Sequence, residues 1–147
     1  MSEEIKQKIA DYLAAHEYLN LATVTAAGTP MAHTVGYTSE GAVVFFVTDG
    51  KTRKARNIAG NPAVAYTVDE DRMTSPTETR GVQMEGTASI VTNQEEAGRI
   101  IAAILAKFPF LKNMPPNPDM TIYKIQPARC VFIDNTKGFG HLDTVTY

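Results

Sequence analysis

Residues 43–62, which read VVFFVTDGKTRKARNIAGNP, carry the clearest structural pattern of this chain. An apolar strand over residues 43–47 leads through a turn at Gly50 into a segment typical of a short helix. Cations at a helix N-terminus are unfavourable by about 0.3–1 kcal/mol each, because the helix dipole is positive there. Backbone N–H groups, hydroxyls and cations together predict a phosphate site, with a solvated basic helix start as the equally weighted alternative. The groups concerned are Thr48, Lys51, Thr52, Arg53, Lys54 and Arg56.

Other motifs with known chemistry are missing from the sequence. Gly50-Lys51-Thr52 matches the end of a P-loop, but Phe45 stands where that motif requires its first glycine, so a nucleotide triphosphatase is not expected. There is no Gly-x-Ser-x-Gly elbow and no Gly-x-Gly-x-x-Gly fingerprint. The three histidines are far apart in the sequence, and we therefore predict no metal site and name no catalytic residue.

Composition places the chain among ordinary globular domains. Its 147 residues, 44% of them apolar, predict a single domain over residues 1–147. A formal net charge of −2 argues against general binding to nucleic acid or anionic membranes. Cys130, the only cysteine, lies in an apolar strand and is expected to be buried and unreactive. The acidic start without a long apolar run predicts no signal peptide and no membrane span, and hence a cytoplasmic protein.

Hydrophobic periodicity predicts many strands and three helices. The strands are expected at 19–25, 30–38, 43–47, 63–68, 80–91 and about 120–126 and 128–134, with turns near 26–29 and 39–41. The helices are an amphipathic one ending near His16, the basic one up to Gly60, and one after Asn93 with an apolar stripe. Residues 69–79 form a polar, mobile loop and residues 137–141 a glycine-bearing tail. Hairpins without a regular strand–helix alternation favour an antiparallel barrel over a doubly wound sheet.

The motifs Phe46-Val47-Thr48, Thr52-Arg53-Lys54-Ala55, Asn57 and Asn61-Pro62 resemble those of FMN-binding split β-barrel proteins related to pyridoxamine 5′-phosphate oxidase. The resemblance covers nearly the whole chain. It implies a mainly β (α+β) fold, a six-stranded antiparallel split barrel with flanking helices. It also implies a homodimer that binds FMN in clefts at the subunit interface. The residues implied to bind this cofactor are Thr48, Thr52, Arg53 and Lys54 at the phosphate, His33, Thr34, Val35 and Gly36 along the flavin, and Val47.

This sequence departs from the family pattern at several positions. His33 stands where the oxidases have an arginine on the phosphate. The glutamine of the family's long strand aligns with Gly81, and Gln83, two residues later on the same face, could replace it. The C-terminal tryptophan and Arg-x-His substrate elements of the oxidases have no counterpart in this chain, which has no tryptophan, and this argues against oxidation of pyridoxamine phosphate. Phe139 or His141 of the tail could lie near the flavin or simply form a turn at a strand end.

Three functions follow from these observations. The first is a cytoplasmic, homodimeric FMN-dependent oxidoreductase with an unknown small-molecule substrate or an electron donor such as NAD(P)H. The second is a protein that binds a flavin, or a related cofactor such as haem or a deazaflavin, for transport or sensing without turnover. The third, a nucleic-acid contact on the basic helix, ranks last because the net charge is negative and the nearest aromatics lie in an apolar strand.

Overall fold

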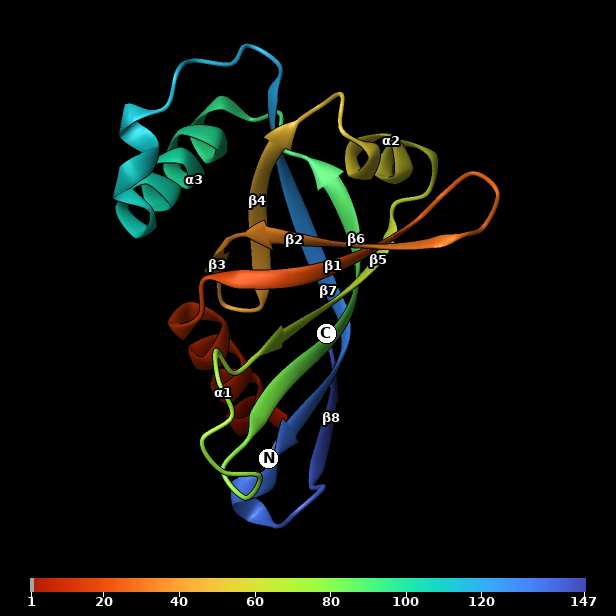
Figure 1. The fold of residues 1–147 in the computed structure, drawn as a ribbon, viewed down its shortest axis with the longest axis vertical. Helices are drawn as coiled ribbons and strands as arrows, with labels where there is room; N and C mark the ends of the chain where they lie inside the picture. The colour runs from red at the N-terminus through yellow and green to blue at the C-terminus, as the bar shows by residue number, and fades with distance from the viewer. Residues whose placement is uncertain (1) are drawn as a thin grey trace.

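The computed structural model describes residues 2–147 as a curled antiparallel sheet flanked by three α-helices (Figure 1). The sheet order is β2-β1-β5-β6-β7-β4-β3, with β8 pairing to β7, and it curls until β2 approaches β4 without forming a ladder. This is the predicted mainly β split barrel. The elements are α1 Ser2–Ala15, β1 Tyr18–Val24, β2 Pro30–Gly36, β3 Thr38–Glu40, β4 Val43–Asp49, α2 Arg53–Gly60, β5 Ala63–Asp69, β6 Arg80–Ile90, α3 Gln94–Lys107, η1 Pro109–Asn113, β7 Met120–Asp134, η2 Asn135–Lys137 and β8 Leu142–Thr146.

The sheet has eight strands, whereas periodicity predicted seven segments and the family resemblance implied a six-stranded barrel. The predicted strand over 30–38 is interrupted at Tyr37, whose N–H donates to the Glu17 carbonyl (3.1 Å) and whose hydroxyl donates to the Leu13 carbonyl. These bonds to the end of α1 and the residues after it separate β2 from the short β3. The predicted glycine-bearing tail leads into β8, which pairs with β7 at the opposite end of the molecule from α2 (Figure 1). Within one chain, the tail is therefore remote from the basic helix.

The two predicted final strands are one strand, β7, of 15 residues. Pro127 lies between the two predicted segments, and proline cannot donate a ladder hydrogen bond. In the structure Pro127 pairs with Gly86, next to an irregularity in the ladder between Glu85 and Gly86. A Cβ on Gly86 would lie only 2.4 Å from the Gln126 carbonyl oxygen, so a glycine is needed for this close approach. The bulge accommodates the proline without ending the strand.

The apolar core is divided between the two faces of β4. Val44 and Phe46 point into the barrel, whereas Phe45 and Val47 point outward, because successive strand residues face opposite sides. Helix α3 covers the outward face with Ile100 and Ile104, and Phe108, the residue that caps its C-terminus, is buried there too. A bidentate pair from Arg99 to Glu40 (2.8 and 3.0 Å) also joins α3 to β3. Helix α1 closes the opposite part of the barrel with Ile5, Ile9, Tyr12 and Leu13.

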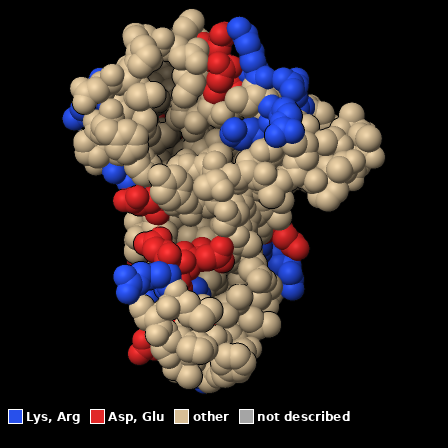
Figure 2. Space-filling model, in the orientation of Figure 1, with Lys and Arg blue, Asp and Glu red and all other residues tan. Residues whose placement is uncertain are grey.

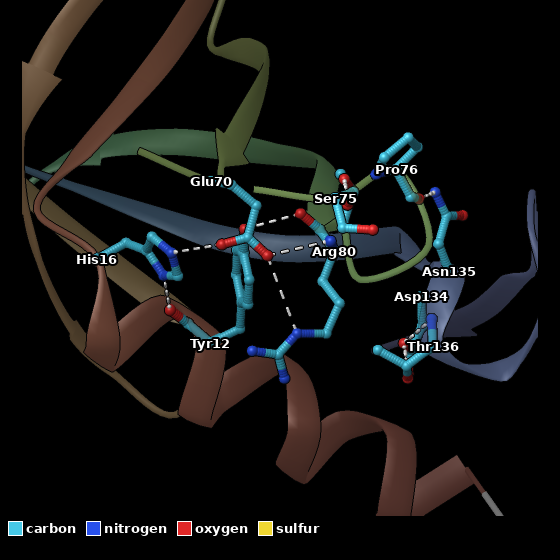
Figure 3. A network of polar contacts seen from close by, with 10 residues as sticks. Tyr12, His16, Glu70, Ser75, Pro76, Arg80, Asp134, Asn135 and Thr136 are labelled. Carbon is cyan, nitrogen blue, oxygen red and sulfur yellow. Dashed lines mark hydrogen bonds and ion pairs between the residues drawn. The ribbon is translucent and has the colours of Figure 1, made fainter. Parts of the chain in front are cut away.

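The polar segment between β5 and β6 contains no helix or strand, as predicted, but it is held at several points (Figure 3). The Glu70 carboxylate accepts from the backbone N–H of Arg80 (3.1 Å) and lies 3.7 Å from the His16 ring. Asn135 donates through its side chain to the Pro76 carbonyl (2.8 Å). The mobility of the segment between β5 and β6 remains a prediction. Over residues 2–147, no helix is both long enough and apolar enough to cross a membrane.

Candidate functional site

The turn between β4 and α2 leaves backbone donors free at the start of the helix. Thr52 is the N-cap: its hydroxyl donates to the Asp49 carbonyl (2.9 Å) and accepts from the Ala55 N–H (3.4 Å). The Asp49 carboxylate accepts from the Lys51 N–H (2.8 Å). The N–H groups of Arg53 and Lys54 have no acceptor within residues 2–147. The first turn of a helix therefore offers two donors to a ligand.

The cations of this segment divide into two kinds. Lys51 forms an ion pair with Asp119 (2.9 Å), and the Arg56 guanidinium donates to the Lys51 carbonyl. Arg53 and Lys54 have no acidic partner among the residues that the structure describes. Figure 2 shows Lys and Arg side chains gathered over α2, at the upper right of that view. Arg56 has no acidic partner within residues 2–147 either, but its guanidinium is bonded to a carbonyl, so Arg53 and Lys54 are the two cations of this segment whose side chains have neither an ion pair nor a hydrogen bond there.

His33 belongs to a polar cluster beneath these cations. Its Nε2 lies 2.9 Å from the hydroxyl of Thr23, which is completely buried. The Asn57 side chain of α2 donates to the same hydroxyl (3.0 Å). Burial, and then the nearby Lys54 and Arg53, lower the pKa of His33, so the ring is neutral at neutral pH. The cluster fixes α2 on β1 and β2 and places a neutral histidine beside the two free cations.

Thr23 was not predicted to contribute to the site. A threonine in an otherwise apolar strand is a weak signal, since threonine is common in strands for its branched shape alone. Asn57 was part of the family resemblance, but its partner could not be identified without the fold. Thr52 was predicted to bind the phosphate, but in the structure its hydroxyl proton is donated to the Asp49 carbonyl.

The other predicted residues of β2 and β4 lie around this cluster on both faces of their strands. Thr48 is buried on the inward face, and its hydroxyl has no hydrogen-bond partner within residues 2–147. The Val35 side chain lies in the core, so only its backbone could contact a ligand. Thr34 and Gly36 face outward on β2. Because β2 is an edge strand, part of its backbone donors and acceptors is unpaired and available.

Gln83 lies apart from these residues in one chain. It is exposed on the outer face of β6, separated from β2 by β1 and β5. The register places Thr34, Asn20, Thr67 and Gln83 in one polar row across the four strands. Gln83 lines a shallow hollow of about 260 Å³ there, together with Asn20 and Arg129 among others. The structure therefore does not bring Gln83 to the start of α2.

An apolar cavity of about 460 Å³ lies between α3, η1 and the outer faces of β2 and β4. It is visible as a hollow at the upper left of Figure 2. Gly36 and Val47, both predicted to contact the cofactor, line it. A Cβ on Gly36 would lie 3.4 Å from the Phe108 ring, at van der Waals contact, so the ring packs directly over β2 at this residue. No pattern in the sequence predicted this cavity.

The cavity rim is joined to the turn that begins α2. The Asn117 side chain donates to the Asp49 carboxylate (3.0 Å), and this bond lowers the pKa of Asp49. The Gly50 N–H donates to the Asp119 carbonyl (2.9 Å). These bonds hold the segment before β7, which supplies part of the rim, against the basic turn. The apolar cavity and the anion site are therefore parts of one region of the molecule.

Two further groups lie outside this region. Burial raises the pKa of Cys130 to about 12, which agrees with an unreactive thiol in the core. No group of three or more His, Cys, Asp or Glu side chains is placed to hold a metal ion within residues 2–147.

Comparison with known proteins identifies relatives of this chain. Residues 5–134 match the family model described as Pyridoxamine 5'-phosphate oxidase. A 5a,11a-dehydrotetracycline/5a,11a-dehydrooxytetracycline reductase of Streptomyces rimosus is 38% identical over 86 residues, which are 56% of this chain and 61% of that protein. The alignment thus spans less than two thirds of the reductase. The UPF0306 protein YhbP of Salmonella schwarzengrund is 32% identical over 105 residues, covering 71% of this chain and 67% of that protein.

Solved structures share the fold at lower sequence identity. A haem-binding protein from Mycobacterium smegmatis matches with a TM-score of 0.80 and 23% identity, over 96% of this chain and 57% of that one. An FAD-binding protein from Mesorhizobium loti matches with a TM-score of 0.70 and 16% identity, over 85% of this chain and 91% of that one. At these identities the likeness concerns the fold alone. The match over residues 5–134 shows that the chain belongs to the pyridoxamine 5′-phosphate oxidase family.

Proposed function

We propose that this protein is an FMN-dependent oxidoreductase that binds the phosphate of FMN at the start of α2. The observation that carries the proposal is the pair of cations, Arg53 and Lys54, that lack an anionic partner within residues 2–147 and whose backbone N–H groups are also free. A phosphate monoester provides the negative charge and the acceptor oxygens that this arrangement lacks.

The residues present fit such a cofactor. Arg53 and Lys54 would bind the phosphate, with the unpaired hydroxyl of Thr48 beside them. The free backbone of β2 near Thr34 and Gly36 would contact the flavin edge. Bound FMN supplies the hydride and electron transfer, while the protein orients it and controls access. The neutral state of His33 avoids a third positive charge next to the two cations.

We also propose a homodimer. Gln83 and the residues around α2 lie in different places of one chain, as expected if each binding site combines residues of two copies. Within residues 2–147, no helix covers the outer face of β1, β5 and β6, which carries the polar row around Gln83 and small residues such as Ala22 and Ala65. Light scattering coupled to size-exclusion chromatography should give twice the chain mass.

The cofactor proposal is tested by titrating the protein with FMN, riboflavin and haem, and following absorbance and flavin fluorescence. FMN should bind much more tightly than riboflavin, which lacks only the phosphate. Equal affinity for the two flavins would contradict a phosphate site at α2. Preferential haem binding, with a Soret band that disappears in a His33→Ala variant, would favour a haem protein instead.

A second candidate is a flavin-binding protein without turnover. It is favoured by the engagement of the carboxylates at the start of α2, because Asp49 accepts from the Lys51 N–H and the Asn117 side chain and Asp119 forms an ion pair with Lys51. Anaerobic stopped-flow mixing of the FMN-loaded protein with NADPH or NADH separates the candidates. Rapid bleaching of the flavin band supports the oxidoreductase, and flavin that stays oxidised supports storage or sensing.

A further inference from the structure

We infer that the cavity between α3, η1 and the sheet binds an uncharged, largely apolar ring compound, and that this is the substrate class of the proposed oxidoreductase. That the bound compound is a substrate rests on the proposed function, whereas its binding follows from the cavity alone. A volume of about 460 Å³ falls within the range of small-molecule sites.

The composition of the cavity wall defines the class of ligand. None of the residues that line it carries a charge. The cation nearest in sequence to the buried end of α3, Lys107, places its ammonium group over the Tyr37 ring (4.1 Å from the ring centre) rather than in the cavity. Phosphates and carboxylates are bound through Arg, Lys or free N–H groups. A second anionic group besides that of the cofactor therefore has no partner here.

The apolar surface at this cavity is unusually exposed. Five of the ten large hydrophobic side chains that are exposed in the described chain belong to its lining: Tyr18, Ile101, Phe110, Met114 and Met120. Exposed apolar side chains that gather in one concave place mark a binding site more often than scattered ones do. Their concentration here shows that the cavity is not a packing defect of the core.

The helix pattern explains how this surface arises. The apolar stripe of α3 is wider than the surface it covers: Ile100 and Ile104 are buried against β4, while Ile101 and Leu105 turn toward the cavity. Aromatic residues of the following segment, Phe108 and Phe110, complete the wall with flat surfaces onto which a ring can stack.

The position of the cavity connects it to the cofactor site. Gly36, predicted along the flavin, and Val47, predicted to bind the cofactor, both belong to its lining. Its rim is hydrogen bonded to the turn that begins α2, through Asn117 to Asp49 and Asp119 to Gly50. A ring bound in the cavity would thus lie next to a flavin whose phosphate is at α2.

The test uses the methionine methyl groups as site-specific probes. Menadione, an uncharged bicyclic quinone, is titrated into protein labelled with ¹³C at the methionine methyls, once without FMN and once with FMN bound. Met114 and Met120 line the cavity, whereas Met84 lies in the core and Met73 in the exposed loop. Saturable shifts confined to Met114 and Met120 are expected in both samples. The sulfonated analogue of menadione should bind at least about tenfold more weakly, because its charge has no partner.

A matched pair of variants places the site on α3. Ile101→Arg introduces a charge into the wall and should weaken menadione binding about tenfold or more. Ala102→Arg adds the same charge at the neighbouring exposed position, which is not part of the lining, and should leave binding unchanged. Circular dichroism and thermal unfolding confirm that both variants fold.

The outcomes separate this inference from the cofactor proposal. Shifts of Met114 and Met120 with menadione, in a protein that fails to bind FMN, would refute the cofactor proposal and leave the cavity as a binding site. FMN that itself shifts both methyls and competes with menadione would show that the flavin ring fills the cavity, which overturns the inference. No saturable shift, or equal loss of binding in the two variants, would also overturn it.

Discussion

Replacing the two free cations of α2 is the most direct perturbation of the proposed cofactor site. Hydrogen bonds to a charged group contribute about 1.5–3 kcal/mol each. Arg53 is exposed, so its contribution should lie near the lower end, whereas Lys54 is partly buried and should contribute more. Since about 1.4 kcal/mol corresponds to a factor of ten in Kd, Arg53→Ala should weaken FMN binding about tenfold and Lys54→Ala up to about a hundredfold.

The matched control is Lys51→Ala, which removes the same charge from the same turn. Lys51 is 78% exposed and forms an ion pair with Asp119, so it should not contact the phosphate. At about 0.15 M salt, distant charges are largely screened, and the Kd of this variant should change less than about threefold. The assay is FMN fluorescence quenching, with riboflavin titrated in parallel because its affinity should be equal in all variants. A Lys51→Ala effect as large as that of Lys54→Ala would refute the reasoning.

Three further predictions concern stability. Thr23→Val should lower the free energy of unfolding by about 1–3 kcal/mol in urea titrations, because it removes a buried hydroxyl shared by two side chains; an unchanged midpoint would contradict the polar cluster. Gly86→Ala should lower the free energy of unfolding by about 1–3 kcal/mol, because the new Cβ would lie 2.4 Å from a backbone oxygen. Gly98→Ala, in open space on α3, should raise it by about 0.5–1 kcal/mol. The opposite order of the two variants in thermal unfolding would show that the bulge adjusts freely. The pKa of His33 is lowered in the folded chain, so below about pH 6.5 the unfolded chain binds a proton that the folded chain does not, and the free energy of unfolding falls as pH decreases toward the folded-state pKa. Comparing urea midpoints at about pH 7.5 and about pH 5.5, this fall should be smaller in His33→Gln, and equal falls would assign it to other groups.

Local patterns predicted most of the elements because they depend on neighbours in sequence. Alternation along residues 80–91 and the apolar stripe after Asn93 correspond to β6 and α3, and the Asn93 side chain accepts from the Glu96 N–H (2.9 Å) as expected for a cap. The Glu96 side chain, however, forms an ion pair with Lys124 of β7 (3.1 Å) instead of completing a capping box. Such a partner, distant in sequence, cannot be read from local spacing.

The differences between the predicted and the observed structure also arise from contacts between residues distant in sequence. In β8 only Val145 is buried, so its apolar pattern is too weak to indicate a strand, and the strand exists because β7 offers an edge to pair with. The basic start of α2 could be predicted from dipole and charge. Which of its cations remain free depends on Asp119, whose position is set by the fold. The apolar cavity was not foreseen because it arises from what α3 leaves uncovered.

The long strand β7 has a consequence for how the chain acquires its structure. Strand β4 pairs only with the three-residue β3 on one side and with β7 on the other. During synthesis, β4 emerges well before its main partner, and its edge stays open until residues beyond Met120 leave the ribosome. Long-range pairing of this kind slows folding and leaves a strand edge unpaired and prone to aggregation. Nascent or truncated chains ending before β7 should therefore depend on chaperones more than chains that include β7.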